Sequence, residues 1–249
     1  MAKAPIRLLV VEDEVELLDV IHRLFASLGF DVKAASDGLA AWQMCEAHEF
    51  DIVLSDVRMP VLNGLELLKK IKARNADCPK VVMMSGHSDF PLSKLYAEGA
   101  DGFFEKPFSS EAVRQFLIDG LVPSSERWSK FSRKPASLRV DFTFRSFDEA
   151  LRTRSLKAGR SGFFQPCDTQ LPMLGTYVDF EFQFREFSGS EKGAGKIDGQ
   201  GIVRFHKQGD SPQSPSGYGV EILQLNFEAG KKWVESVRAW GIVASIPES

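Results

Sequence analysis

The stretch Asp51-Ile-Val-Leu-Ser-Asp56, followed by Val-Arg-Met-Pro60 and then Asn63-Gly64, decides the fold of the first half of the chain. It is a short apolar run that ends in a carboxylate and a turn. An apolar run of this length predicts a strand that is buried on both faces of a parallel sheet. Open parallel sheets bind their ligands at the carboxyl ends of the strands, so we expect Asp56 at a binding edge.

Three other apolar runs of the first half are also followed by polar side chains. These side chains are Glu12 and Asp13 after Leu8–Val11, Ser85 after Val81–Met84, and Lys106 after Gly102–Glu105. Any one of them, taken alone, is typical of a turn residue or a helix cap. Their repeated position at a strand exit indicates that they share one site at one edge of the sheet.

The residue types at these exits suit phosphoryl transfer. An aspartate carboxylate is a competent nucleophile toward phosphorus, which is the role expected of Asp56. Mg²⁺ prefers oxygen ligands, and Glu12, Asp13 and Asp56 can supply them while the metal offsets their mutual repulsion. Lys106 carries a mobile positive charge for a phosphoryl oxygen, and Ser85 offers a hydroxyl donor.

Strands and helices are expected to alternate as far as Leu121. Residues Val15, Leu18, Ile21, Leu24 and Phe25 recur at helical spacing. The expected helices are Glu14–Leu28, Leu39–Ala47, Gly64–Arg74, Leu92–Ala97 and Ser110–Leu121, and a further strand is expected at Asp31–Ala35. Such alternation predicts an α/β doubly wound, five-stranded parallel sheet.

Residues 7–121 resemble the receiver domain of a two-component response regulator, which has a flavodoxin-like fold. The resemblance rests on LLVVEDE (8–14), DIVLSDVRMPVLNG (51–64), VVMMSGHSD (81–89) and DGFFEKPF (101–108). It implies that Asp56 is the phosphoacceptor and that Glu12, Asp13, Asp56 and the backbone carbonyl of Arg58 bind Mg²⁺. It also implies that Ser85 and Phe103 form the switch, that Lys106 contacts the phosphoryl group, and that the donor is a sensor histidine kinase or a phosphotransfer protein.

Length and charge point to more than one domain. The 249 residues suggest two domains, and residues 1–122 carry 13 Lys+Arg against 19 Asp+Glu, whereas residues 123–249 carry 18 against 15. We expect a receiver at 1–122, a linker or basic arm at 123–136 and an output domain at 137–249. The apolar runs are too short for a membrane span, and three scattered cysteines fit a reducing, cytoplasmic setting.

The second half has the pattern of a β protein. Val178, Phe180, Phe182 and Phe184 alternate with polar residues, as expected of a half-buried strand. Further strands are expected at Leu138–Phe144, Gly201–Phe205 and Tyr218–Leu223, and a helix at Lys231–Trp240. Several short strands and a terminal helix predict a small, mostly-β barrel. No pair of adjacent amphipathic helices suggests a helix-turn-helix, so DNA binding is not expected.

The second half also resembles a PilZ domain, a β-barrel known as a receptor for cyclic di-GMP. The supporting stretches are SLKAGRSGFF (155–164), LPMLGT (171–176), GQGIVRF (199–205) and GYGVEILQL (217–225). The family's ligand motifs are altered, because Lys130 and Lys134 stand at the two arginine positions and Lys157 at the acidic position, while Gly162 is kept. Lysine lacks the planar fork of arginine and has no lone pair to offer a base, so cyclic di-GMP binding is not the expected role.

Three classes of function follow from these observations. The first is a phosphorylation switch in which Asp56 controls how the barrel meets an unknown partner protein, without stand-alone enzyme activity. The second is a cyclic di-GMP receptor that the receiver tunes. The third is a DNA-binding transcriptional regulator. A homodimer is compatible with all three.

Overall fold

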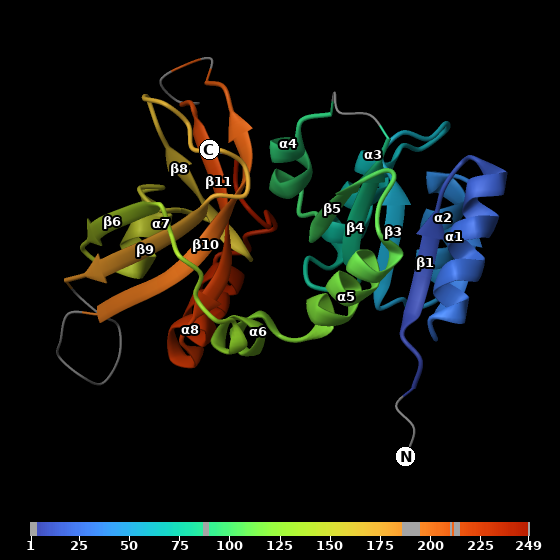
Figure 1. Cartoon of the computed structure of the whole chain (residues 1–249), viewed down its shortest axis with the longest axis horizontal. Helices are drawn as coiled ribbons and strands as arrows, with labels where there is room; N and C mark the ends of the chain where they lie inside the picture. Colours follow the sequence, from blue (N-terminus) through green and yellow to red (C-terminus); the bar gives the residue numbers. More distant parts are fainter. Residues whose placement is uncertain (1–3, 87–89, 186–194, 210, 212–214, 249) are drawn as a thin grey trace. The chain divides into compact units, whose positions relative to one another are not determined.

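The computed structural model describes residues 4–86, 90–185, 195–209, 211 and 215–248 (Figure 1). The chain divides into two compact units, Met1–Leu121 and Val122–Ser249. The second unit begins one residue before the boundary expected from the sequence.

The first unit is a five-stranded parallel sheet in the order β2-β1-β3-β4-β5. Its strands are β1 (Arg7–Val11), β2 (Asp31–Ala35), β3 (Ile52–Asp56), β4 (Lys80–Ser85) and β5 (Gly102–Glu105). Its helices are α1 (Val15–Ser27), α2 (Gly38–Ala47), α3 (Gly64–Arg74), α4 (Leu92–Ala97) and α5 (Ser110–Leu121). This arrangement confirms the expected doubly wound fold.

Both faces of the parallel sheet are buried. Leu9 and Val53 belong to one apolar cluster, whereas their chain neighbours Leu8 and Ile52 belong to another. Successive side chains of a strand point to opposite faces, so a continuous apolar run is needed when helices cover both of them. The apolar runs of the sequence are therefore explained by helices on the two sides of the sheet.

The second unit is a six-stranded mixed sheet in the order β6-β9-β10-β11-β8-β7. Its strands are β6 (Leu138–Phe144), β7 (Lys157–Ala158), β8 (Gly162–Pro166), β9 (Tyr177–Phe184), β10 (Gly195–Lys207) and β11 (Gly217–Leu225). Its helices are α6 (Ser124–Lys130), α7 (Phe147–Arg152) and α8 (Phe227–Ala239). β6 and β9 run parallel, and the other neighbours are antiparallel.

The sheet of the second unit is curled but open. The register of β10 against β11 shifts after Gln200 and again after Val203, and such bulges bend a strand. In the part of the chain that the structure describes, the end strands β6 and β7 do not pair with each other. The expected mostly-β domain with a C-terminal helix is confirmed, but its described strands form a half-barrel rather than a closed barrel.

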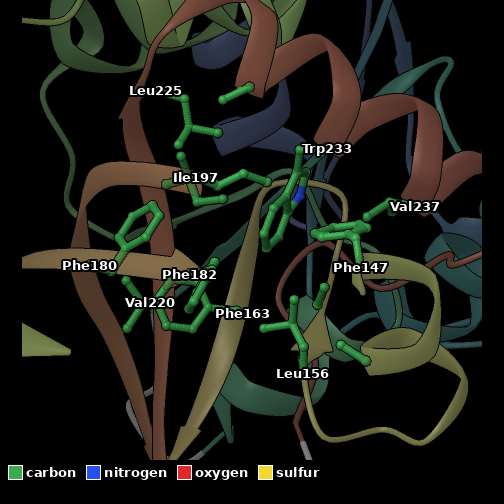
Figure 2. Packing of buried hydrophobic residues seen from close by; sticks show 14 of the residues in the cluster. Phe147, Leu156, Phe163, Phe180, Phe182, Ile197, Val220, Leu225, Trp233 and Val237 are labelled. Carbon is green, nitrogen blue, oxygen red and sulfur yellow. The ribbon is translucent and has the colours of Figure 1, made fainter. Parts of the chain in front are cut away.

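The core of the second unit is built from aromatic side chains. Figure 2 shows Trp233 of α8 beside Phe147 of α7 and above Phe182 and Phe163 of the sheet. The rings of Phe182 and Trp233 stack with their centroids 6.1 Å apart, and Trp233 Nε1 donates to the carbonyl oxygen of Gly159 at 2.9 Å. The helix thus closes the open side of the curled sheet.

The segment expected as a linker at 123–136 is only partly an extended arm. Residues Ser124–Lys130 form α6, and its Trp128 is fully buried in the core of the second unit. Gly230 of α8 makes room for this contact, since a Cβ there would lie 3.3 Å from the Trp128 ring. The bulky apolar residue, rather than local helix propensity, holds this short helix in place.

Candidate functional site

The carboxyl edge of the parallel sheet gathers the polar residues that follow its strands. Asp56 is the last residue of β3. Val11, the last residue of β1, pairs with Ser55 of β3, so Glu12 comes next to Asp56 one position further along. Ser85 is the last residue of β4, and its carbonyl oxygen accepts a hydrogen bond from the backbone N–H of Lys106 at 2.8 Å. The strand register therefore brings together residues that are up to 94 positions apart in sequence.

Lys106 links two buried carboxylates. Its Nζ lies 2.5 Å from Asp56 Oδ1 and 2.6 Å from Glu12 Oε2. The other oxygen of Asp56, Oδ2, accepts the backbone N–H of Arg58 at 2.6 Å. Both Asp56 oxygens are thus held by donors, which fixes the orientation of the carboxylate at the sheet edge.

Burial sets the electrostatics of this site. The exposed fraction is only 6% for Asp56 and 3% for Glu12. Burial raises the pKa of Glu12 and outweighs the hydrogen bond from Lys106, which acts in the opposite direction. Burial also acts to lower the pKa of Lys106, but its hydrogen bonds to Asp56 and Glu12 prevail and leave this pKa raised. The ammonium group therefore stays charged between the two carboxylates.

A glycine and a helix cap shape the loop beside Asp56. A Cβ on Gly64 would lie 2.0 Å from the backbone oxygen of Asp56, so only glycine permits this close approach. Asn63 caps α3 through a capping box with Glu66, in which each side chain accepts the other residue's backbone N–H. These two residues return the chain tightly over the end of β3, so the buried Asp56 lies directly beneath a compact turn.

An open hollow of about 440 Å³ adjoins the acidic edge. Its lining includes Asp13, Arg58, Asn63 and Phe90, and Asp13 is exposed. Carboxylates and a nearby backbone carbonyl form the donor set that a hard cation such as Mg²⁺ prefers. Among the described residues, however, no three acidic, histidine or cysteine side chains are already gathered tightly enough to hold a metal ion. The residue types fit the metal, while Lys106 separates two of the three carboxylates.

The two residues expected to form the switch lie on neighbouring strands. Ser85 is 1% exposed at the end of β4, and Phe103 is half-buried on β5, where it pairs with Met83. Phe103 packs against the apolar cluster that includes Met83 and Leu95. Residues 87–89 of the VVMMSGHSD stretch lie outside the described residues.

The candidate ligand residues of the second unit lie on different elements, namely α6, the arm that follows it, β7 and β8. Lys130 is exposed at the end of α6, and the backbone of Lys134 exchanges hydrogen bonds with the Gln200 side chain at 2.7 and 2.8 Å. Lys157 lies on β7 with its ammonium 5.5 Å from the centre of the Phe164 ring. Gly162 allows its strand to approach β11, because a Cβ there would lie 2.1 Å from the Val220 oxygen.

The structure also gives Gln200 a structural role that the sequence did not indicate. Gln200 is fully buried, although it is polar, and it also donates to Asp179 at 2.8 Å. It anchors the extended arm after α6 to β10 and β9. No local sequence signal marks this residue, because its partners lie 21 and 66 positions away.

The fold and the acidic edge define an α/β domain with a buried aspartate and a lysine at the carboxyl ends of its strands. Residues 8–118 match the family described as the response regulator receiver domain. The chain is 32% identical over 151 residues to the transcriptional regulatory protein FixJ of Bradyrhizobium diazoefficiens, which is 60% of this chain and 71% of that protein. The chain therefore belongs to the response regulators, and its receiver is the first unit.

Other relatives share a smaller part of their length with the chain. A probable transcriptional regulator, ycf29 of Porphyra purpurea, is 32% identical over 117 residues, which is 46% of this chain and 56% of that protein. Among solved structures, a receiver domain from Clostridium thermocellum is 27% identical with a TM-score of 0.44 and covers 47% of this chain and 94% of its own. The chemotaxis regulator CheY4 of Vibrio cholerae is 26% identical with a TM-score of 0.44, covering 47% and 99%.

Among the described helices, none is both long enough and apolar enough to cross a membrane.

Proposed function

We propose that the protein is a phosphorylation switch. Asp56 accepts a phosphoryl group, and this modification changes how the second unit binds a partner protein. The observation that carries this proposal is the buried Asp56 carboxylate at the end of β3, held by Lys106 and by the backbone of Arg58. The donor is a histidine kinase or a phosphotransfer protein, in keeping with membership of the response regulators.

The chemistry uses residues already at the carboxyl edge. An Asp56 oxygen attacks phosphorus, the bond between phosphorus and the donor's leaving group breaks, and an acyl phosphate forms on Asp56. Glu12, Asp13, Asp56 and the Arg58 carbonyl would hold Mg²⁺, which supplies positive charge against the phosphoryl oxygens. Lys106 would exchange its contact with Asp56 Oδ1 for a phosphoryl oxygen. Later attack by water on phosphorus breaks the acyl phosphate bond, releases inorganic phosphate and returns the Asp56 carboxylate.

The switch rests on the residues next to the acceptor. A phosphoryl group adds roughly one to two negative charges and three acceptor oxygens. Ser85 and Lys106 would move toward these oxygens, and Phe103 would repack into the space that Ser85 leaves. Such a change is a two-state shift biased by one local charge event.

The second unit, whose sequence resembles a PilZ domain, is the proposed output module. Its altered motif positions support protein contact over cyclic di-GMP binding, since Lys130 ends α6, the backbone of Lys134 bonds to Gln200 and Lys157 packs on Phe164. A DNA-binding output is the other alternative, because FixJ and ycf29 are named as transcriptional regulators. A saturable calorimetric isotherm with cyclic di-GMP, or a salt-dependent DNA mobility shift, would favour the corresponding alternative.

The test of the acceptor is labelling of the full chain by a small acyl phosphate donor in the presence of Mg²⁺. We expect mass spectrometry to find one added phosphoryl group, located on Asp56 and lost in Asp56→Asn. The matched control is Asp31→Asn, the same substitution at an exposed residue of the opposite sheet edge, which should label normally. Labelling that persists in Asp56→Asn would place the acceptor elsewhere and overturn the proposal.

A further inference from the structure

The strand β6 forms an open edge of the second unit. It pairs with β9 on one side and is the first strand in the sheet order (Figure 1). No other strand of the described residues pairs with it. An edge strand of 7 residues presents a row of backbone donors and acceptors that can template the addition of another strand.

The hydrogen bonds to β9 show which backbone groups of β6 face outward. The N–H of Arg185 donates to the carbonyl oxygen of Phe144 at 3.1 Å, and Phe144 pairs with Phe184. In a parallel pair the N–H and C=O groups of alternate residues point to the same neighbour. The even-numbered residues of β6 therefore bond to β9, and Arg139, Asp141 and Thr143 direct their backbone groups away from it.

The inner face of β6 is incompletely covered. Leu138, Val140, Phe142 and Phe144 pack against the core cluster, yet each is only half-buried. The corresponding inward residues of β9, from Val178 to Phe184, are fully buried. An added strand would extend the apolar layer and remove further apolar surface of β6 from water.

We propose that a second copy of this chain adds to this edge, with the two β6 strands antiparallel and related by a two-fold axis at Val140. Residues that lie equally far before and after Val140 then face each other across the axis. Arg139 of each copy therefore faces Asp141 of the other. These are the residues whose backbone groups point outward, so each pair also exchanges two backbone hydrogen bonds. The opposite charges meet twice across the axis, and Leu138 meets Phe142 on the apolar face.

Charge selects this register among the neighbouring ones. A two-fold axis at Asp141 would place Asp141 opposite its own copy and Arg139 opposite Thr143. An axis at Arg139 would place the two Arg139 side chains opposite each other. Like charges directly opposite each other destabilise a strand pair, whereas opposite charges stabilise it. Only the axis at Val140 pairs every charged side chain of β6 with its opposite.

The test measures the dimer dissociation constant of the full chain by analytical ultracentrifugation. Arg139→Asp and Asp141→Arg should each raise it by about tenfold or more, because both cross-strand pairs become repulsive. A mixture of the two variants should form a heterodimer, since every facing pair is again of opposite charge. The double variant, with both substitutions in one chain, should recover the dissociation constant of the unchanged protein.

Two controls separate strand pairing from general charge effects. Arg23→Asp and Asp19→Arg reverse the same residue types in a surface ion pair of α1, at 2.7 Å, and should leave the dissociation constant unchanged. Asp141→Pro removes an outward N–H without touching the bonds to β9 and should weaken the dimer even if a charge variant folds poorly. Circular dichroism establishes that each variant is folded.

The outcomes divide clearly. An unchanged protein that stays monomeric at all accessible concentrations overturns the proposal, as do single charge reversals that associate as tightly as the unchanged protein. A double variant that associates as weakly as the single variants overturns the register centred on Val140. Weakening by the single variants together with recovery in the double variant supports it.

Discussion

The two units of this protein bury their apolar residues in different patterns. This difference decides which polar residues can be predicted from sequence to lie together. In the receiver, the strand β3 is apolar from Ile52 to Leu54 and ends in the buried Asp56. In the second unit, β9 alternates buried aromatic residues with polar ones such as Asp179 and Glu181. A parallel sheet buried on both faces leaves polar residues only at its strand ends, so they converge on one edge.

The mixed sheet of the second unit has one exposed face and places its polar residues differently. They are spread along the outer face, where they bond to neighbouring strands, as Arg139 does to Glu181 at 3.3 Å. A functional side chain on such a face is indistinguishable in sequence from a solvated one. This is why Asp56, Glu12 and Lys106 could be placed together from their sequence positions, whereas no such rule applies to the polar residues of the second unit.

The largest expected effect tests whether the two cores are energetically separate. Trp233→Ala removes a fully buried side chain at the centre of the aromatic cluster and should lower the unfolding free energy of the second unit by about 4 kcal/mol. The receiver has its own apolar clusters, so it should keep its stability. Hydrogen exchange with mass spectrometry measures the two units in one experiment by comparing β9–β11 with β1, β3 and β4.

Trp240→Ala is the matched control, because this tryptophan follows the same helix and is 45% exposed. Its effect should stay within about 0.5 kcal/mol. An equal loss of protection in both units of Trp233→Ala would show that the two cores unfold together rather than separately.

The fold of the receiver could be predicted because its signals are local. Apolar runs set its strands, helical spacing set its helices, and Asn63 with Glu66 marks the start of α3 by a capping box that is visible in the sequence. The gathering of Glu12, Asp56 and Lys106 follows from the rule that strand ends of a parallel sheet share an edge. What remained hidden was the direct contact of Lys106 with both carboxylates, since side-chain geometry does not follow from spacing.

The second unit was predicted less well because its decisive interactions are long-range. The parallel pairing of β6 with β9 joins residues 40 positions apart, such as Leu138 and Val178, and no local pattern announces it. The difference between a closed barrel and a half-barrel depends on whether the end strands meet, which propensity does not determine. Helix α6 has only 7 residues and depends on burial of Trp128, so a polar stretch appeared to be a linker.

The next largest effect is expected from Lys72, a buried charge of the receiver that no pattern in the sequence indicates. Lys72 of α3 is 2% exposed, and its Nζ lies 2.6 Å from Asp101 Oδ2 while it also donates to the carbonyl oxygens of Ala76 and Pro79. Lys72→Met leaves Asp101 without this partner and should lower the unfolding free energy of the receiver by about 3 kcal/mol. Hydrogen exchange should show the loss in β1, β3 and β4 and leave β9–β11 unchanged.

Lys69→Met provides the comparison on the same helix. Lys69 is half-exposed and pairs with Glu98 at 2.9 Å, so its replacement should cost less than about 1 kcal/mol. If Lys72→Met were as mild as Lys69→Met, the buried pair would not contribute to receiver stability. The stability of the receiver would then rest on its apolar clusters.

The smallest expected effect compares acidic residues of the two units by their titration. Hydrogen bonds from Lys196, and then from Gln183, hold the pKa of Glu181 at about 2, against an ordinary value of 4.5. The contribution of Glu181 to stability is therefore fully present above pH 4.5 and is lost as the pH falls through about 2. Carbon-detected NMR of the glutamate carboxyl groups should show this low pKa, and Lys196→Gln should raise it toward 4.5. In the receiver, Arg7 lowers the pKa of Asp51, and this should not change in Lys196→Gln. A Glu181 that titrates near 4.5 in the unchanged protein would mean that the outer face of β9 is a set of independent solvated charges rather than a bonded network.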